Sequence, residues 1–175
     1  MNETLQTIQA RRSIRSFRPE LPPKELIDQV IEAGLCAPSG MGKQGSIIVA
    51  VTDPALRAQL AELNRKAANW DEGIDPFYGA PVVLSVLADP SIPTWVNDGS
   101  LTLGNMLIAA QSLGLGNIWV NRAKEVFESE QGRAILKDLG VEGDYVGVGH
   151  CVLGYAAVEP PAAPARRSGR VFRAE

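Results

Sequence analysis

Two clusters of arginine stand at opposite ends of this chain. The first places four arginines within residues 11–18, and the second contains Arg166, Arg167, Arg170 and Arg173. The chain as a whole carries a net charge of −3, so both positive clusters are local features. Guanidinium groups pair with phosphate through two parallel hydrogen bonds, which favours a discrete anion such as a phosphate group over a polyanion. The alternative is that both clusters are solvated terminal segments.

Other residue types that perform catalysis are scarce. His150 is the only histidine, which argues against a multi-histidine metal site and against most Ser-His or Cys-His nucleophile systems, so we expect no metal. It lies in an apolar strand, where core packing or the lining of a cleft is expected. Cys36 and Cys151 have the usage of reduced, buried thiols. Because the sequence offers no acid–base pair or nucleophile suited to catalysis, the chemistry must come from a cofactor.

Two stretches of the chain are similar to nucleotide-binding motifs but do not match the residues that those motifs require at fixed positions. The stretch 40–44 lacks the first glycine of a phosphate-binding P-loop, because Ala37 stands there, and has Gln44 where Ser or Thr is needed. The stretch 147–152 fails the dinucleotide fingerprint at its last position and lies within a strand. The interleaved basic and aromatic surface of a single-strand binder is also missing. We therefore expect no nucleic-acid partner.

Length and composition bound the class of protein. With 175 residues, 45% hydrophobic and 21% charged, the chain is expected to form a single domain over 1–175. No stretch offers the roughly 18 uncharged apolar residues of a membrane span, and no targeting segment opens the sequence. We therefore expect no membrane partner and a cytoplasmic location.

Hydrophobic patterning predicts alternating helices and strands. Strands are expected at 46–52, 81–88, 118–120 and 145–155. Helices are expected at 3–10, 24–36, from Pro54 onward after the cap Asp53, at 97–113 and at 124–139. This order indicates an α+β sandwich with helices on both faces of a mixed central sheet. Helix 97–113 is apolar around its whole circumference, which favours a homodimer.

Four segments carry a recognisable combination of residues, namely 11–17, 37–44, 114–119 and 153–155. Taken together and in this order, they resemble the FMN-dependent nitroreductase family, and the resemblance covers essentially the whole chain. Residues 75–81 look like a compact bacterial branch of the family. The resemblance implies a nitroreductase-like three-layer sandwich. It also implies a homodimer whose C-terminal arms, about 156–175, pack on the partner subunit, with non-covalent FMN bound at the interface.

The resemblance also implies roles for individual residues. Phosphate and ribityl contacts fall on Arg11, Arg12, Ser13 and Arg15, and the arm would close on the phosphate with Arg166 and Arg167 or Arg170. Ring contacts from the partner subunit fall on Pro38, Ser39, Gly40 and Gln44, while Trp119, Val120 and Asn121 would lie against the isoalloxazine. The substrate pocket is assigned to Phe77, Tyr78 and Arg122, although core packing stays open for both aromatics.

The implied activity is ping-pong reduction of an electron-poor acceptor, such as a nitroaromatic or quinone, by NAD(P)H through flavin N5. The flavin carries the chemistry, and no side chain is assigned as catalytic. Two alternatives remain: a non-catalytic flavin-binding carrier or sensor, and a flavin enzyme of the same fold acting on another substrate. Gly42 stands where many members have Asn, and Asn121-Arg122 stands where many have Glu-Gly. Both departures bear on substrate choice.

Overall fold

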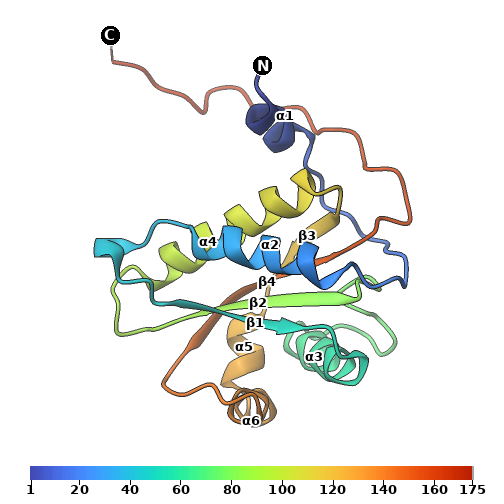
Figure 1. Cartoon of the computed structure of the whole chain (residues 1–175), viewed down its shortest axis with the longest axis vertical. Helices are drawn as coiled ribbons and strands as arrows, with labels where there is room; N and C mark the ends of the chain where they lie inside the picture. Colours follow the sequence, from blue (N-terminus) through green and yellow to red (C-terminus); the bar gives the residue numbers. More distant parts are fainter. Residues whose placement is uncertain (175) are drawn as a thin grey trace.

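Four β-strands form the centre of the fold in a computed structural model that describes residues 1–174 (Figure 1). They are β1 (Ser46–Val51), β2 (Val82–Ala88), β3 (Gly116–Val120) and β4 (Val146–Gly154), arranged in the order β1-β2-β4-β3. Every residue of β2 is buried, which explains its continuous apolar sequence. All four predicted strands are confirmed, with small shifts at their ends.

The strand directions differ from the prediction. Neighbouring strands in the described chain all pair antiparallel, so the expected mixed sheet is wrong for these four strands. An isolated bridge between Ser13 and Asn117 supplies parallel pairing at the edge of β3. Apolar runs predict that a strand is buried but not its direction, because the connecting segments here are long enough to return either way.

Helices cover both faces of the sheet, as expected for a three-layer α+β sandwich (Figure 1). One face carries α2 (Lys24–Leu35) and α4 (Trp95–Ser112), and α1 (Glu3–Ala10) lies beyond α4. The other face carries α3 (Pro54–Ala67), α5 (Ala123–Glu128) and α6 (Glu130–Asp138). A short 3-10 turn spans Gly40–Gly42. Each layer of helices shares a buried apolar cluster with the sheet, so the predicted fold class is confirmed.

The predicted single helix over 124–139 is wrong, because the chain breaks at Ser129. This residue adopts extended backbone (φ −68°, ψ 157°), and its Oγ accepts a hydrogen bond from the Gly132 N–H at 3.0 Å. A Cβ at Gly132 would lie 2.0 Å from the carbonyl oxygen of Val126. Only glycine permits this close approach between α5 and α6.

The segment after β4 leaves the sandwich. Ala156 bridges Phe17, and the Ala157 N–H donates to the Ser16 carbonyl at 3.0 Å. Residues 159–174 are exposed and run past α1 (Figure 1). Within the described residues, no helix has both the length and the apolar character needed to cross a bilayer.

Candidate functional site

The N-terminal arginine cluster is held against the edge strand β3. Ile14 and Phe17 are buried and anchor the segment in the core, and the Ile14 N–H donates to the Asn117 carbonyl at 3.0 Å. Side chains alternate in extended backbone, so Ser13 and Arg15 project away from the core on either side of Ile14. The buried residues thus aim the polar ones outward.

A cleft of about 510 Å³ opens beside β3. It is lined by Arg11, Ser13, Arg15, Asn64, Ala68, Trp70, Tyr78, Leu107, Ile118, Trp119, Val120, Asn121 and Arg122. Eight of these residues were predicted for the site, from the N-terminal cluster, the β3 segment and the Tyr78 turn. Three arginines and no Asp or Glu occur among the described lining residues, so the cleft is suited to anions.

The far end of the cleft is fixed by a residue that sequence reasoning missed. Asn64 of α3 is 1% exposed, and its Nδ2 donates to the carbonyl of Asn121 at 2.8 Å. This bond holds the backbone where it turns out of β3. An asparagine four residues after Leu60 on the apolar face of a helix was the available signal, since buried polar groups need a partner. Trp70, also missed, follows α3 in a loop.

Trp119 gives the cleft a flat aromatic surface. A Cβ at Gly149 would lie 2.4 Å from Trp119 Nε1, so the indole lies directly over the glycine of the neighbouring strand β4. Trp119 stays 47% exposed in this position. A planar group in the cleft can therefore lie against its ring.

Tyr78 reaches the cleft from a turn with φ +55°. The Asp75 carboxylate holds this turn by accepting from the Phe77 N–H at 3.0 Å, the Gly79 N–H at 2.8 Å and the Arg57 guanidinium at 2.5 Å. Burial raises the pKa of Asp75, but the Arg57 hydrogen bond and the two N–H groups outweigh it, so the net pKa is lowered. Asp75 therefore stays ionised and keeps Tyr78 in place.

Phe77 corrects the prediction of a pocket aromatic, because it is fully buried and does not line the cleft. Its ring centroid lies 5.3 Å from that of His150, and the Arg57 guanidinium lies 5.5 Å from its centroid. His150 is also core: its Nδ1 lies 2.8 Å from Ser85 Oγ, and burial lowers its pKa to about 3. Phe77 and His150 are therefore core residues, which is the alternative that the sequence left open for both.

The two cysteines differ from each other. Cys151 is fully buried, and desolvation raises the pKa of its thiol to about 12. Cys36 is exposed where α2 ends, so the expectation of two buried thiols is wrong for this residue.

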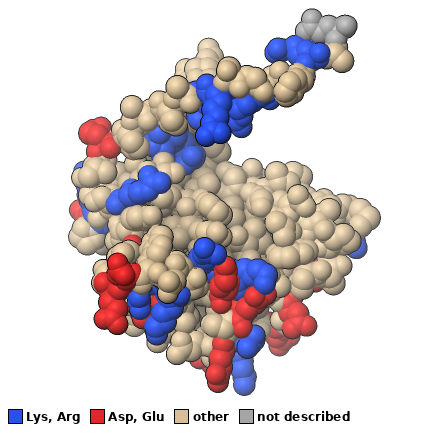
Figure 2. All heavy atoms as spheres, turned by 180° about the vertical axis from the view of Figure 1, so that it is seen from behind, with Lys and Arg blue, Asp and Glu red and all other residues tan. Residues whose placement is uncertain are grey.

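Arg12 does not line the cleft. Its guanidinium donates to the carbonyls of Gln9 at 2.7 Å, Arg11 at 2.8 Å and Pro161 at 3.1 Å. It therefore ties the start of the C-terminal segment to the N-terminal one. Further along, Arg166, Arg167 and Arg170 are exposed, and none of them lines the cleft of its own chain. Figure 2 shows basic side chains gathered along the projecting segment.

The loop at residues 37–44 lines a separate cavity of about 160 Å³ through Pro38, Ser39 and Gln44, and Asp98 of α4 lines the same cavity. Asp98 of α4 accepts from the Gly40 N–H at 3.0 Å, and Ser39 Oγ accepts from the Gln44 N–H at 2.9 Å. These contacts fix the loop. Within one chain, however, the structure does not bring the loop residues into the cleft beside β3.

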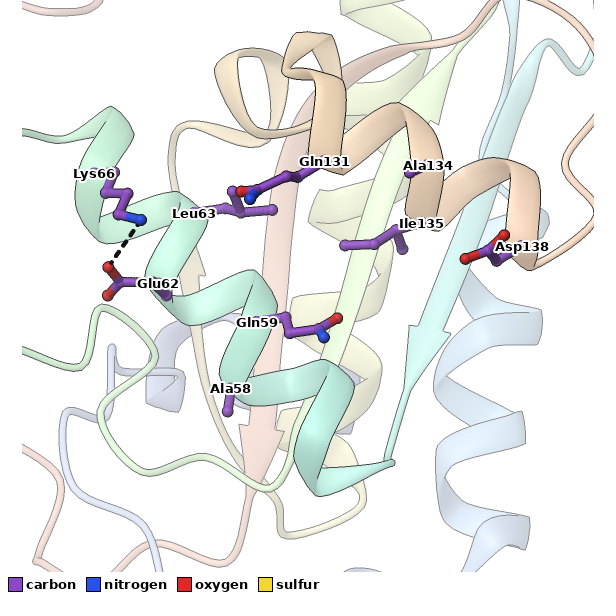
Figure 3. Close-up of a pocket in the computed structure, with 9 residues that line it drawn as sticks. All are labelled: Ala58, Gln59, Glu62, Leu63, Lys66, Gln131, Ala134, Ile135 and Asp138. Atoms are coloured by element: carbon purple, nitrogen blue, oxygen red, sulfur yellow. Dashed lines mark ion pairs between the residues drawn. The ribbon is translucent and has the colours of Figure 1, made fainter.

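A third cavity, of about 540 Å³, lies between α3 and α6 (Figure 3). Apolar side chains such as Leu63 and Ile135 face it, and the ion pair Glu62–Lys66, at 3.3 Å, lies at one end. None of the predicted site residues lines this groove. The cleft beside β3 is therefore the site that agrees with the sequence.

Comparisons with known proteins identify the family of this chain. Residues 8–155 match the model of the nitroreductase family. The chain is 34% identical over 141 residues to an NADPH-flavin oxidoreductase of Vibrio harveyi, covering 73% of this chain and 59% of that protein. It spans 60% of the length of a relative from Methanothermobacter thermautotrophicus, at 32% identity over 67% of this chain.

Solved structures match over the full length. An FMN-bound nitroreductase of Bacteroides fragilis superposes with a TM-score of 0.91 at 28% identity, covering 100% of both chains. An FMN-bound nitroreductase of Desulfitobacterium hafniense gives a TM-score of 0.88 at 29% identity, again covering 100% of both chains. With its sandwich fold, its arginine-lined cleft beside β3 and the match over residues 8–155, this chain belongs to the nitroreductase family.

Proposed function

We propose that this protein is an FMN-dependent oxidoreductase. It would take reducing equivalents from NAD(P)H and pass them, in a ping-pong cycle, to an electron-poor small molecule such as a nitroaromatic or quinone. The observation that carries the proposal is the cleft beside β3, with three arginines at its surface, no acidic lining residue and an exposed indole. The FMN-bound relatives support the choice of cofactor.

The residues present fit FMN. Arg11, Ser13 and Arg15 offer two guanidiniums and a hydroxyl to a phosphate, which accepts charge-assisted hydrogen bonds from both kinds of donor. Trp119 and the backbone of Val120 and Asn121 would support the planar ring. The cleft volume of about 510 Å³ falls within the range of small-molecule sites.

FMN, when bound, would supply hydride acceptance and electron transfer, which no side chain in the cleft provides. The protein's own contribution is positioning and electrostatics. The Asp75 clamp holds Tyr78 at the wall of the cleft, and the Asn64 hydrogen bond fixes the backbone of Asn121. Trp119 and Leu107 would exclude water from the ring-binding region.

A second copy of the chain would complete the site. Pro38, Ser39, Gly40 and Gln44 are held firmly in their loop but do not line the cleft of their own chain. Arg166, Arg167 and Arg170 also stay outside it. We therefore propose a homodimer in which these groups reach the partner's cleft.

Purified protein tests the proposal directly. We expect yellow protein whose flavin absorption bleaches with anaerobic NADH or NADPH and returns when a nitroaromatic or quinone is added. Colour without bleaching would instead support a flavin carrier or sensor. Bleaching without reoxidation by either acceptor would support another substrate. Protein that takes up no FMN from solution would overturn the proposal.

A further inference from the structure

Arg122, at the end of the cleft, violates two local preferences. Its φ of +81° lies in the left-handed region, which strains a residue that has a Cβ. It is also the N-cap residue of α5, yet its side chain makes no capping hydrogen bond. Arginine has no acceptor atom to offer at a cap, where Ser, Thr, Asp or Asn would stabilise the helix. Neither the turn nor the helix accounts for an arginine here.

The guanidinium of Arg122 is only partly engaged. Nη1 donates to Glu125 Oε1 at 2.9 Å, and 44% of the arginine side chain remains exposed. Ion pairs at such exposure contribute little to stability, so this contact does not explain the strained backbone. Glu125 does not line the cleft, and the described residues that do line it include no Asp or Glu. The free edge of the guanidinium can therefore meet an anion in the cleft.

This cation stands apart from the one predicted to hold a phosphate. Ser13 bridges Asn117 at one end of β3, and Asn121 lies four residues further along. At about 3.3 Å per residue, the two ends of the cleft are roughly 13 Å apart. The ion pair with Glu125 holds the Arg122 guanidinium toward α5, whereas a phosphate bound by the short Ser13 side chain lies at the other end of the cleft. We therefore take an anion at Arg122 to be a second charged group.

We propose that Arg122 binds an oxyanion carried by the substrate that enters the cleft after FMN. The inference rests on the proposed function and specifies its substrate class. The oxyanion has two possible sources, a carboxylate on the electron acceptor or the 2′-phosphate of the donor nucleotide NADPH. Both present the oxygen pair that a guanidinium recognises.

Binding to the oxidised, FMN-loaded protein separates the two sources. Calorimetric titrations compare 4-nitrobenzoate with 4-nitrobenzyl alcohol, and NADP⁺ with NAD⁺. For Arg122→Gly we expect the preference for the member with the additional oxyanion, 4-nitrobenzoate or NADP⁺, to fall about tenfold in one pair, the value of one charge-assisted hydrogen bond. Loss in the nitrobenzoate pair assigns the acceptor, and loss in the NADP⁺ pair assigns the donor. The melting temperature should not fall, because glycine tolerates this backbone.

Two neighbouring variants sharpen the test. Glu125→Gln releases the guanidinium and should strengthen binding of the member with the additional oxyanion. Lys124, next to Glu125 in α5, forms an ion pair with Glu128. Lys124→Gln also removes one positive charge and should leave the preference unchanged. An unchanged preference in Arg122→Gly, or an equal loss of affinity for both members of each pair, would overturn the inference alone. Failure to take up FMN would overturn the proposed function, and the inference with it.

Discussion

Neighbouring arginines of the N-terminal cluster have different surroundings. Arg15 projects into the cleft, whereas Arg12 donates to three backbone carbonyls and lies outside it. Sequence reasoning assigned both to one phosphate, because spacing alone does not show which side chains a buried neighbour turns outward. Ile14, at 3% exposure, supplies that information only in the folded chain.

This difference predicts unequal effects on cofactor binding. Arg15→Ala should weaken FMN binding about tenfold to a hundredfold, since it removes a charge-assisted hydrogen bond. Arg12→Ala should weaken it less and should make the C-terminal segment more sensitive to protease, because the Pro161 carbonyl loses its donor. Quenching of FMN fluorescence on titration with apoprotein measures the affinity. Arg133→Ala, at an exposed arginine of α6, is the matched control, and equal affinity in all variants would contradict the assignment.

His150 predicts a pH dependence of stability. An unfolded histidine has a pKa near 6.5, whereas burial lowers the pKa of His150 to about 3, so only the unfolded chain gains this proton at pH 5. The contribution to stability is complete above pH 6.5. It falls by roughly 1.4 kcal/mol per pH unit below that, or about 2 kcal/mol at pH 5.

Nuclear magnetic resonance can follow this imidazole without assignment, because His150 is the chain's only histidine. We expect its nitrogen shifts to remain those of the neutral ring from pH 8 to pH 5, while urea unfolding at the same pH values reports the loss of stability. A ring that titrates near 6.5 in the folded protein would show that the site admits solvent.

At the scale of elements, the junction between α5 and α6 depends on one glycine. Gly132→Ala would place a methyl group 2.0 Å from the Val126 carbonyl oxygen and should destabilise the fold by about 1–3 kcal/mol. Ser129→Ala removes the cap and the hydrogen bond that Ser129 Oγ donates to the Val126 carbonyl at 2.6 Å, without adding a steric clash, and should cost about 1 kcal/mol. Urea denaturation of both variants gives the comparison. Equal stability of Gly132→Ala and the parent protein would mean that the two helices can separate freely.

The helices and strands show which structural features can be predicted from short stretches of sequence. Apolar runs and caps predicted the four strands and most helices, because burial of these segments dictates their composition. The break at Ser129 was readable as a cap residue followed by Glu130, but the amphipathic pattern continued across it and concealed it. Strand direction was not readable. The cleft contributions of Asn64 and Trp70 arise only when the end of α3 packs beside β3.

At the scale of the whole molecule, exposed apolar side chains on α4 and the C-terminal segment favour a surface that a second chain covers. Leu101 and Val96 of α4 are each 47% exposed, although other positions of the helix are buried in the core. The C-terminal segment carries Val171 and Phe172, at 70% and 91% exposure, away from its own chain. The almost complete exposure of Phe172 on a projecting segment, together with a helix that has apolar residues around its circumference, favours a contact with another protein.

If α4 and the arms join two copies, a charge on α4 should separate them. Leu101→Glu should shift the protein to monomers in sedimentation velocity, because burying a carboxylate at an apolar interface is unfavourable. Leu139→Glu is the matched control, since Leu139 is 48% exposed beyond α6 on the opposite face of the sheet. The monomer should also release FMN, because loop 37–44 and the arm arginines of the partner would be lost. A Leu101→Glu protein that stays dimeric and yellow would place the interface elsewhere, whereas a monomer that retains FMN would show that one chain's cleft is sufficient.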